Sequence, residues 1–287
     1  LDLLAEFSRV CEKYNLRWWI DAGTLLGAVR HKGFIPWDDD IDIVMLRKDY
    51  DVLLEIAQKE FYSPYFLRHY SNTKQLLPFA KLHNETTTML EGPAVSFLKK
   101  GKKINYSQGI YIDIFPLHDI SDDEAEFTAL FNKAALFRRK ASILHKYTDS
   151  YIPAVKKWKR PFKALLHYAI SFLYDASQTR LYFDKFMNAI NSSVYQESKR
   201  VAALCWAGND WAEAEHFFPD RILQRSYFDR TIYLPFEMME LPAPSCYEKI
   251  LDAYYGDWRD YKIVGHHGKF YDTERPYTYY TEEGHKF

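Results

Sequence analysis

The chain has 287 residues, of which 47% are hydrophobic and 27% are charged, the balance of an ordinary globular protein. Its net charge of −1 gives the protein as a whole no electrostatic reason to bind nucleic acid. The three cysteines lie far apart without C-x-x-C spacing, which argues against a disulfide framework and fits a reducing compartment. No apolar run is long enough to span a bilayer, and residues 1–6 carry acids where a signal peptide carries basic residues. We therefore expect a cytoplasmic protein.

Hydrophobic periodicity predicts an α+β fold, with a mixed sheet early in the chain and a helical lobe later. We expect a catalytic core over residues 1–120, a helical and basic lobe over 121–225, and a segment 226–287 that returns to the core with strands, a helix and a Tyr- and His-rich tail. The helices are predicted at 1–15, 25–31, 48–60, through most of 121–200, and at 247–255. The strands are predicted at 17–20, 40–45, 65–70, 79–82, 86–90, 110–115 and within 227–241, and the tail beyond 256 is predicted as loop.

An acidic run stands out at residues 38–42. Alternate residues of a strand face one side, so Asp38, Asp40 and Asp42 are predicted to point one way, with Asp39 facing away. Three carboxylates on one face repel one another unless a hard, oxygen-seeking cation such as Mg²⁺ or Mn²⁺ neutralises them. A calcium-binding EF-hand is excluded because Ile43 stands where that loop requires glycine. An Asp-x-Asp glycosyltransferase remains open at this point.

A second feature lies upstream of the acids. Gly23-Thr24 follows a predicted strand and precedes a short helix, for which Thr24 is well placed as the N-cap. Backbone N–H groups and the helix dipole at such a turn favour a phosphate. A strand, a Gly-Thr turn, a helix and then an acidic strand together predict a phosphoryl-transfer site.

This arrangement resembles the nucleotidyltransferase fold, whose signature is Gly-Gly or Gly-Ser, then Asp-x-Asp, then a carboxylate on a later strand. The chain is similar in particular to the LicD family of phosphocholine transferases, which are related to the fukutin-type ribitol-phosphate transferases. The residues that carry the resemblance are Asp21-Ala22-Gly23-Thr24-Leu25-Leu26-Gly27-Ala28-Val29-Arg30, Ile35-Pro36-Trp37-Asp38-Asp39-Asp40-Ile41-Asp42, Lys81, Thr86-Thr87-Thr88, the strand from Gly109 to Leu117, and Tyr254-Tyr255-Gly256-Asp257.

The resemblance implies the roles of the site residues. Asp113 is implied as the third carboxylate, and its strand agrees because it alternates with Ile112 and Ile114; Asp119 is the fallback. Two Mg²⁺ or Mn²⁺ ions are implied, held by Asp38, Asp40, Asp42 and Asp113, which are also the implied catalytic residues. Implied substrate contacts are Gly23, Thr24, Arg30, Trp37 and Lys81.

The resemblance also implies the reaction: transfer of phosphocholine from CDP-choline to a sugar hydroxyl of a glycan precursor of the teichoic acid or lipopolysaccharide type. Choline is read by aromatic faces, for which Trp18, Trp19, Trp37, Tyr111 and the Tyr-rich tail are candidates. Two alternatives remain. The same fold can transfer ribitol phosphate or a nucleoside monophosphate, or the chain can be a non-catalytic glycan-binding protein.

One segment is not explained by catalysis. Ten Lys or Arg residues but a single acid, Asp149, lie between Lys133 and Lys163. We consider contact with an anionic membrane, where a lipid-linked glycan acceptor would be found, beside a solvated helical face or a groove for a phosphate-rich acceptor. The protein would then be cytoplasmic and peripheral at the inner face of the cell membrane. His266-His267 is a further loop pair without an assigned role.

Overall fold

The computed structural model describes residues 1–73, 76–90, 109–148, 176–192, 198–207, 221–260 and 270–275. The chain forms two compact units. The first comprises Leu1–Leu117 together with Ser226–Phe287, and the second comprises His118–Arg225. The basic stretch 156–163 and the pair His266-His267 lie outside the described residues.

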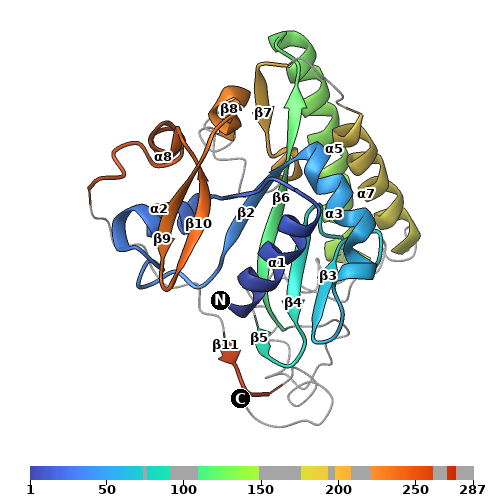
Figure 1. The fold of residues 1–287 in the computed structure, drawn as a ribbon. Coiled ribbons are helices and arrows are strands. Elements are labelled where there is room, and N and C mark those ends of the chain that lie inside the picture. The colour runs from blue at the N-terminus through green and yellow to red at the C-terminus, as the bar shows by residue number, and fades with distance from the viewer. Residues whose placement is uncertain are drawn as a thin grey trace, which may run out of the picture. The chain divides into compact units, whose positions relative to one another are not determined.

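The first unit is built on a mixed sheet with the strand order β1-β2-β6-β4-β3 (Figure 1). The neighbours β2 and β6 are parallel, and the other neighbouring pairs along this order are antiparallel. This is the α+β architecture with a nucleotidyltransferase-like mixed sheet that the sequence predicts. The strands are β1 (Trp19–Ile20), β2 (Asp42–Leu46), β3 (Tyr65–Arg68), β4 (Ala80–Asn84) and β6 (Ile110–Ile120).

The two faces of this sheet differ in chemistry because successive side chains alternate between them. One face carries Ile43, Ile114 and Leu82, all fully buried, and belongs to the apolar core. The helices α1 (Asp2–Lys13) and α3 (Arg47–Glu60) pack on the sheet through apolar side chains that recur at helical spacing. The opposite face carries the residues that alternate with these three along their strands, including polar ones, and the candidate site lies there.

The C-terminal part of the first unit packs beside the start of the chain. The hairpin β9 (Thr231–Phe236) and β10 (Met239–Pro244) contacts α2 (Ala22–His31) and β1, and α2 also contacts α8 (Tyr247–Tyr255). The Trp19 indole donates to the Thr231 hydroxyl over 2.9 Å, which ties the hairpin to β1. The tail, predicted as loop, contains the strand β11 (Phe270–Asp272), which pairs with β5 (Thr88–Leu90). The local sequence pattern does not predict β11, because its pairing partner β5 lies about 180 residues earlier in the chain.

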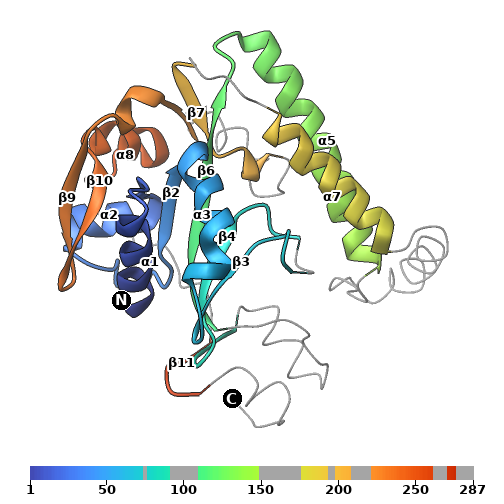
Figure 2. The same cartoon turned by 45° about the vertical axis from the view of Figure 1, so that its right-hand side comes forward.

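The second unit contains two helices that pack side by side, α5 (Glu124–Thr148) and α7 (Ala176–Asn191) (Figure 2). It also contains the antiparallel strands β7 (Arg200–Ala202) and β8 (Ile222–Gln224), with β7 pairing with the end of β6. A short 3₁₀ turn occurs at η2 (Leu204–Trp206), and a second, η4 (Arg225–Phe228), begins at the last residue of this unit. Within the described part of the chain, no helix is both long and apolar enough to cross a membrane.

Candidate metal and phosphate site

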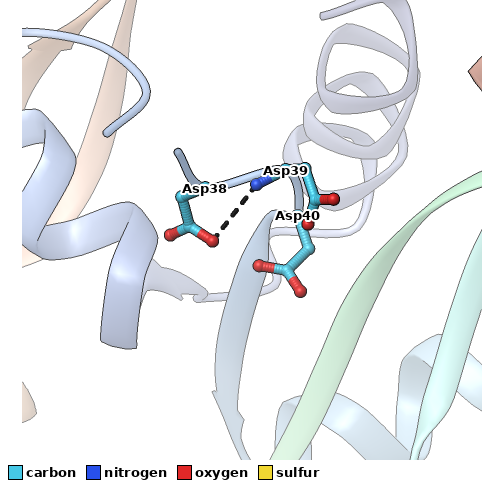
Figure 3. Close-up of side chains that lie close together, drawn as sticks. All are labelled: Asp38, Asp39 and Asp40. Atoms are coloured by element: carbon cyan, nitrogen blue, oxygen red, sulfur yellow. Dashed lines mark hydrogen bonds between the residues drawn. The ribbon is translucent and has the colours of Figure 1, made fainter. Parts of the chain in front are cut away.

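The acidic run lies in a loop that leads into β2. The strand begins at Asp42 and not at Asp40, so strand alternation does not apply to the acids before it. One carboxylate oxygen each from Asp38, Asp39 and Asp40 lies within 4.8 Å of the other two (Figure 3). The Asp39 amide donates to Asp38 Oδ1 over 3.2 Å. The prediction that Asp39 faces away is therefore wrong, because a loop backbone can bring three successive side chains together.

Asp42 and Asp113 are neighbours across the sheet. They are register partners on the parallel strands β2 and β6, which lie about 4.8 Å apart. The Asp113 amide donates to the Ile41 carbonyl over 2.9 Å, which fixes this register at the edge of the acidic loop. The fallback, Asp119, lies six residues further along β6, about 20 Å away, and is ion-paired with Arg225. The structure thus brings Asp113, and not Asp119, to Asp42.

The acids in this region act on one another electrostatically. Burial raises the pKa of Asp42 well above its usual range, and Asp40, Asp113, Asp21 and Asp38 raise it further through their like charge. A carboxylate in such surroundings is costly to ionise unless a positive charge is close. The donor set consists of carboxylate oxygens, which are the ligands that Mg²⁺ and Mn²⁺ prefer. The residues present therefore fit a hard divalent cation.

Lys81 supplies a positive charge to this face of the sheet. It is the register partner of Asp113 on β4, and its ammonium lies 2.8 Å from Asp113 Oδ1. The same ammonium lies 3.5 Å from the centre of the Tyr111 ring and 5.5 Å from that of Phe79. Lys81 is only 7% exposed, so this ion pair is largely removed from water. Three neighbouring strands thus carry ionisable side chains side by side: Asp42, Asp113 and Lys81.

The helix α2 begins earlier than predicted. It starts at Ala22 with Asp21 as its N-cap, so Gly23 and Thr24 lie in its first turn and Thr24 is not the cap. Thr24 is 3% exposed, and its hydroxyl accepts a hydrogen bond of 2.8 Å from the Asp42 amide. The hydroxyl therefore joins α2 to the first residue of β2. The amides of the first turn have no acceptor within the helix, as at any helix start, and this is the property that favours an anion there.

Gly23 lies directly against an acid of the loop. A Cβ atom added at Gly23 would collide with Asp38 Oδ2. Glycine is favoured here by this close approach and not by backbone conformation, since no positive φ occurs at this position. The end of the Asp38 side chain can move more easily than the helix, so a larger residue at Gly23 is accommodated by displacing the carboxylate.

We therefore expect Gly23→Ala to impair function without unfolding the protein. Alanine in the first turn of α2 favours the helix by up to about 1 kcal/mol, which offsets the local collision. Displacement of Asp38 should lower Mg²⁺-supported turnover by about tenfold to 100-fold, as for loss of a positioning contact around a metal. Thermal melting and activity titrated against Mg²⁺ would test this. Asp38→Asn should reproduce the activity loss. Gly256→Ala would not serve as a glycine control, because Gly256 has a φ of 62° and alanine would strain the backbone there.

The remaining predicted substrate contacts lie around α2 and the loop. Arg30 is in the last turn of α2, seven residues or about 10 Å along the helix axis from Gly23. Trp37 immediately precedes the acids, is half-buried, and meets the His31 ring edge-to-face at 6.5 Å. By contrast, Trp18 and Trp19 are core residues, 6% and 0% exposed. Of these three tryptophans, only Trp37 is partly exposed.

Sequence patterning missed a buried histidine on the same face as Lys81. His83 is 3% exposed, and its Nδ1 lies 3.1 Å from the Gly109 carbonyl, which fixes Nδ1 as the protonated nitrogen. Its Nε2 is buried and has no hydrogen-bond partner among the described residues. Burial, and then the charges of Lys81 and Arg68, lower the pKa of His83 to about 3. The sequence signal for this histidine was its spacing: it lies two residues after Lys81, on the same face of a strand.

We expect His83 to make the protein less stable as the pH falls. The folded pKa is below the unfolded value of about 6.5, so the unfolded chain binds the proton first and stability is lost below pH 6.5. At pH 5 the loss is about 2 kcal/mol. Urea unfolding of His83→Gln at pH 7 and pH 5 should show this difference largely removed. The partly exposed His31→Gln serves as the control and should retain it.

Comparison with known proteins relates the sequence of this chain to a family of transferases. Residues 15–152 match the domain described as LicD/FKTN/FKRP, nucleotidyltransferase domain. The chain is 25% identical to the lipopolysaccharide cholinephosphotransferase LicD of Haemophilus influenzae over 263 residues, which cover 90% of this chain and 88% of that protein. It is 45% identical to the human ribitol 5-phosphate transferase FKRP over 40 residues, which are 14% of this chain and 8% of that protein.

The matched range includes the features that build the site, from the β1–α2 turn through the acidic loop to Asp113 and Lys81. The long match to the Haemophilus protein extends over nearly the whole chain and thus over both compact units. Residues 15–152 thus match the LicD/FKTN/FKRP nucleotidyltransferase domain, and the similarity to the Haemophilus protein continues beyond them.

Proposed function

We propose that this protein is a metal-dependent phosphotransferase that moves phosphocholine from CDP-choline to a sugar hydroxyl of a lipopolysaccharide-type glycan. The observation that carries the proposal is the acidic centre at the β2–β6 edge in a chain that is similar over 90% of its length to a lipopolysaccharide cholinephosphotransferase. A teichoic-acid precursor is the second acceptor class to test, because it offers the same hydroxyl chemistry.

The metal in this proposal is Mg²⁺ or Mn²⁺, with two ions in the active form. Asp40 and Asp42 would hold both, with Asp38 and Asp113 completing the set. Asp39 joins the candidates because its carboxylate lies with those of Asp38 and Asp40. When bound, such ions polarise the phosphoryl oxygens and lower the pKa of the acceptor hydroxyl.

The surrounding residues would position the donor. The first-turn amides of Gly23 and Thr24 would direct a partial positive charge at the diphosphate of the donor. Lys81 holds Asp113 in place through the 2.8 Å ion pair and brings a cation to the face where the phosphates would lie. Arg30 is the second candidate to balance phosphate charge. Trp37 is the first aromatic to test for the choline group, because its ring is partly exposed beside the acidic loop.

The proposal is tested by incubating the purified chain with CDP-choline, Mg²⁺ and a lipopolysaccharide or teichoic-acid acceptor. Mass spectrometry of the acceptor should show a phosphocholine adduct, and CMP should be released in proportion. Both signals should disappear with EDTA and return with Mg²⁺ or Mn²⁺. Asp113→Asn is the matched inactive variant. Release of CMP together with free phosphocholine, formed by transfer to water, would mean that the acceptor is another glycan, and absence of both CMP and adduct would refute phosphocholine transfer.

A second candidate keeps the same chemistry but transfers ribitol phosphate. The short match to the human ribitol 5-phosphate transferase favours it. CDP-ribitol offered in competition with CDP-choline separates the two, because the preferred donor should give the larger kcat/KM. A nucleoside monophosphate adduct on the acceptor would indicate the third option. A non-catalytic glycan-binding protein would bind the acceptor equally well after Asp42→Asn and would release no CMP.

A further inference from the structure

Among the described residues of the second unit, α5 has an outward face that does not pack against the rest of the unit. Residues of this helix at the inward positions, such as Ala134, Ala135 and Ala141, are buried against the rest of the unit. The outward positions include Leu136 and Ile143, which are 50% and 51% exposed. They are seven residues apart, two helical turns, and therefore lie on one stripe.

Basic residues surround these two apolar side chains. Lys133 and Lys140 are exposed and lie three residues before and four residues after Leu136, on the same stripe. Arg139 is also exposed beside it. The sequence of α5 contains no Asp or Glu after Glu126. The outward face of α5 thus combines apolar and positive side chains without a compensating acid of its own helix.

The outward face of α7 continues this surface. Leu181 is 44% exposed, and Lys185 is exposed one turn further along the helix. Tyr182 joins the two helices, because its ring centre lies 5.3 Å from the Lys140 ammonium and 5.0 Å from the Lys185 ammonium. The nearby acid Asp184 forms a 2.8 Å ion pair with Arg180 on its own helix. The exposed stripes of α5 and α7 therefore meet and form one patch.

Arg138 lies between the two helices, whereas the apolar residues of the patch lie outside them. Arg138 lies on the inward side of α5, with its guanidinium 5.6 Å from the Phe183 ring centre and 5.2 Å from that of Phe186. Leu136 and Ile143 stay outside although a cation occupies the interior between the helices. Exposed Leu and Ile side chains beside a partly buried arginine are informative about a surface partner.

We propose that this α5–α7 patch, formed by Lys133, Leu136, Lys140, Ile143, Leu181, Tyr182 and Lys185, docks on the anionic surface of a lipid bilayer. Lysine ammonium groups are attracted to an anionic leaflet, and their aliphatic stems let neighbouring Leu and Ile side chains reach the acyl boundary. Protein interfaces are depleted of lysine at their centres, which argues against a protein partner. The proposal goes beyond phosphocholine transfer and would bring the enzyme to acceptors held in the membrane.

The test is co-sedimentation of the full chain with vesicles of phosphatidylcholine alone or with one quarter phosphatidylglycerol. Binding should be at least about tenfold stronger to the anionic vesicles and should weaken as salt is raised. Lys133→Glu/Lys140→Glu should lose at least about tenfold in partitioning, and so should Leu136→Ser/Ile143→Ser. The charge-matched control Lys48→Glu/Lys59→Glu, exposed on α3 of the other unit, should bind within about threefold of the parent.

Equal binding to both vesicle types, or equal loss in the α3 control, would overturn the proposal. Retention on duplex DNA without retention on vesicles would assign the patch to nucleic acid instead. CMP release from CDP-choline with a water-soluble acceptor is measured on every variant. Unchanged release shows that the variant is folded and keeps failure of membrane docking distinct from failure of phosphocholine transfer.

Discussion

Asp42→Asn should give a protein that is inactive and, without metal, more stable than the parent. Asp42 is surrounded by carboxylates, and burial together with Asp40, Asp113, Asp21 and Asp38 raises its pKa well above the usual range. An amide of the same shape removes one buried charge and keeps the Asp42 backbone bond to Thr24. Relief of this repulsion should contribute about 1 kcal/mol or more, raising the melting temperature by about 2–4 °C.

The activity of Asp42→Asn should fall by about 10³-fold or more, because a lost metal ligand removes several kcal/mol of transition-state stabilisation. Melting in EDTA, melting in Mg²⁺ and CMP release would be measured on both proteins. Mg²⁺ should stabilise the parent more than the variant. Asp229→Asn, at an exposed acid, serves as the control and should change none of these. A variant that melts lower than the parent in EDTA would contradict the electrostatic account of this site.

The sequence predicts those parts of the fold that bury a periodic apolar face, and it predicts the polar loop of the candidate site less well. The helices α1, α3 and α8 and most strands of the mixed sheet agree with the predicted positions because each buries one periodic apolar face. The start of β2 was placed two residues early because three consecutive aspartates satisfy a strand, a turn or a loop equally well. Only contacts from other parts of the chain decide, such as the Thr24 hydroxyl on the Asp42 amide.

The residues of the candidate site can be named from the sequence, whereas their geometry cannot. Gly23, Asp38, Asp42 and Asp113 follow from local patterns and family resemblance. That Gly23 touches Asp38, or that Asp113 pairs in register with Asp42, depends on how distant strands align. Local sequence sets the spacing within a strand, whereas the register between strands is set by packing of the whole sheet.

Lys81 is the clearest case of a residue whose environment the sequence did not reveal. It was predicted as a phosphate contact, and the structure gives it a second role as the buried partner of Asp113. Lys81→Met keeps an unbranched side chain of similar length but removes the ammonium that lies over the Tyr111 and Phe79 rings, and it leaves Asp113 without this charge partner. We expect a loss of about 3 kcal/mol in the free energy of unfolding when metal is absent, as is typical when one member of a buried pair is removed.

The double variant Lys81→Met/Asp113→Asn separates this cause from lost packing. The double variant should recover most of the 3 kcal/mol in the free energy of unfolding, because it leaves no unpaired ion of this pair in the sheet. Urea unfolding of the parent, both single variants and the double variant gives the coupling energy directly. If Lys81→Met were destabilised through packing alone, Asp113→Asn would restore nothing. Mg²⁺ should also recover part of the stability of Lys81→Met, since a cation bound by Asp42 and Asp113 would take over the neutralisation that Lys81 provides.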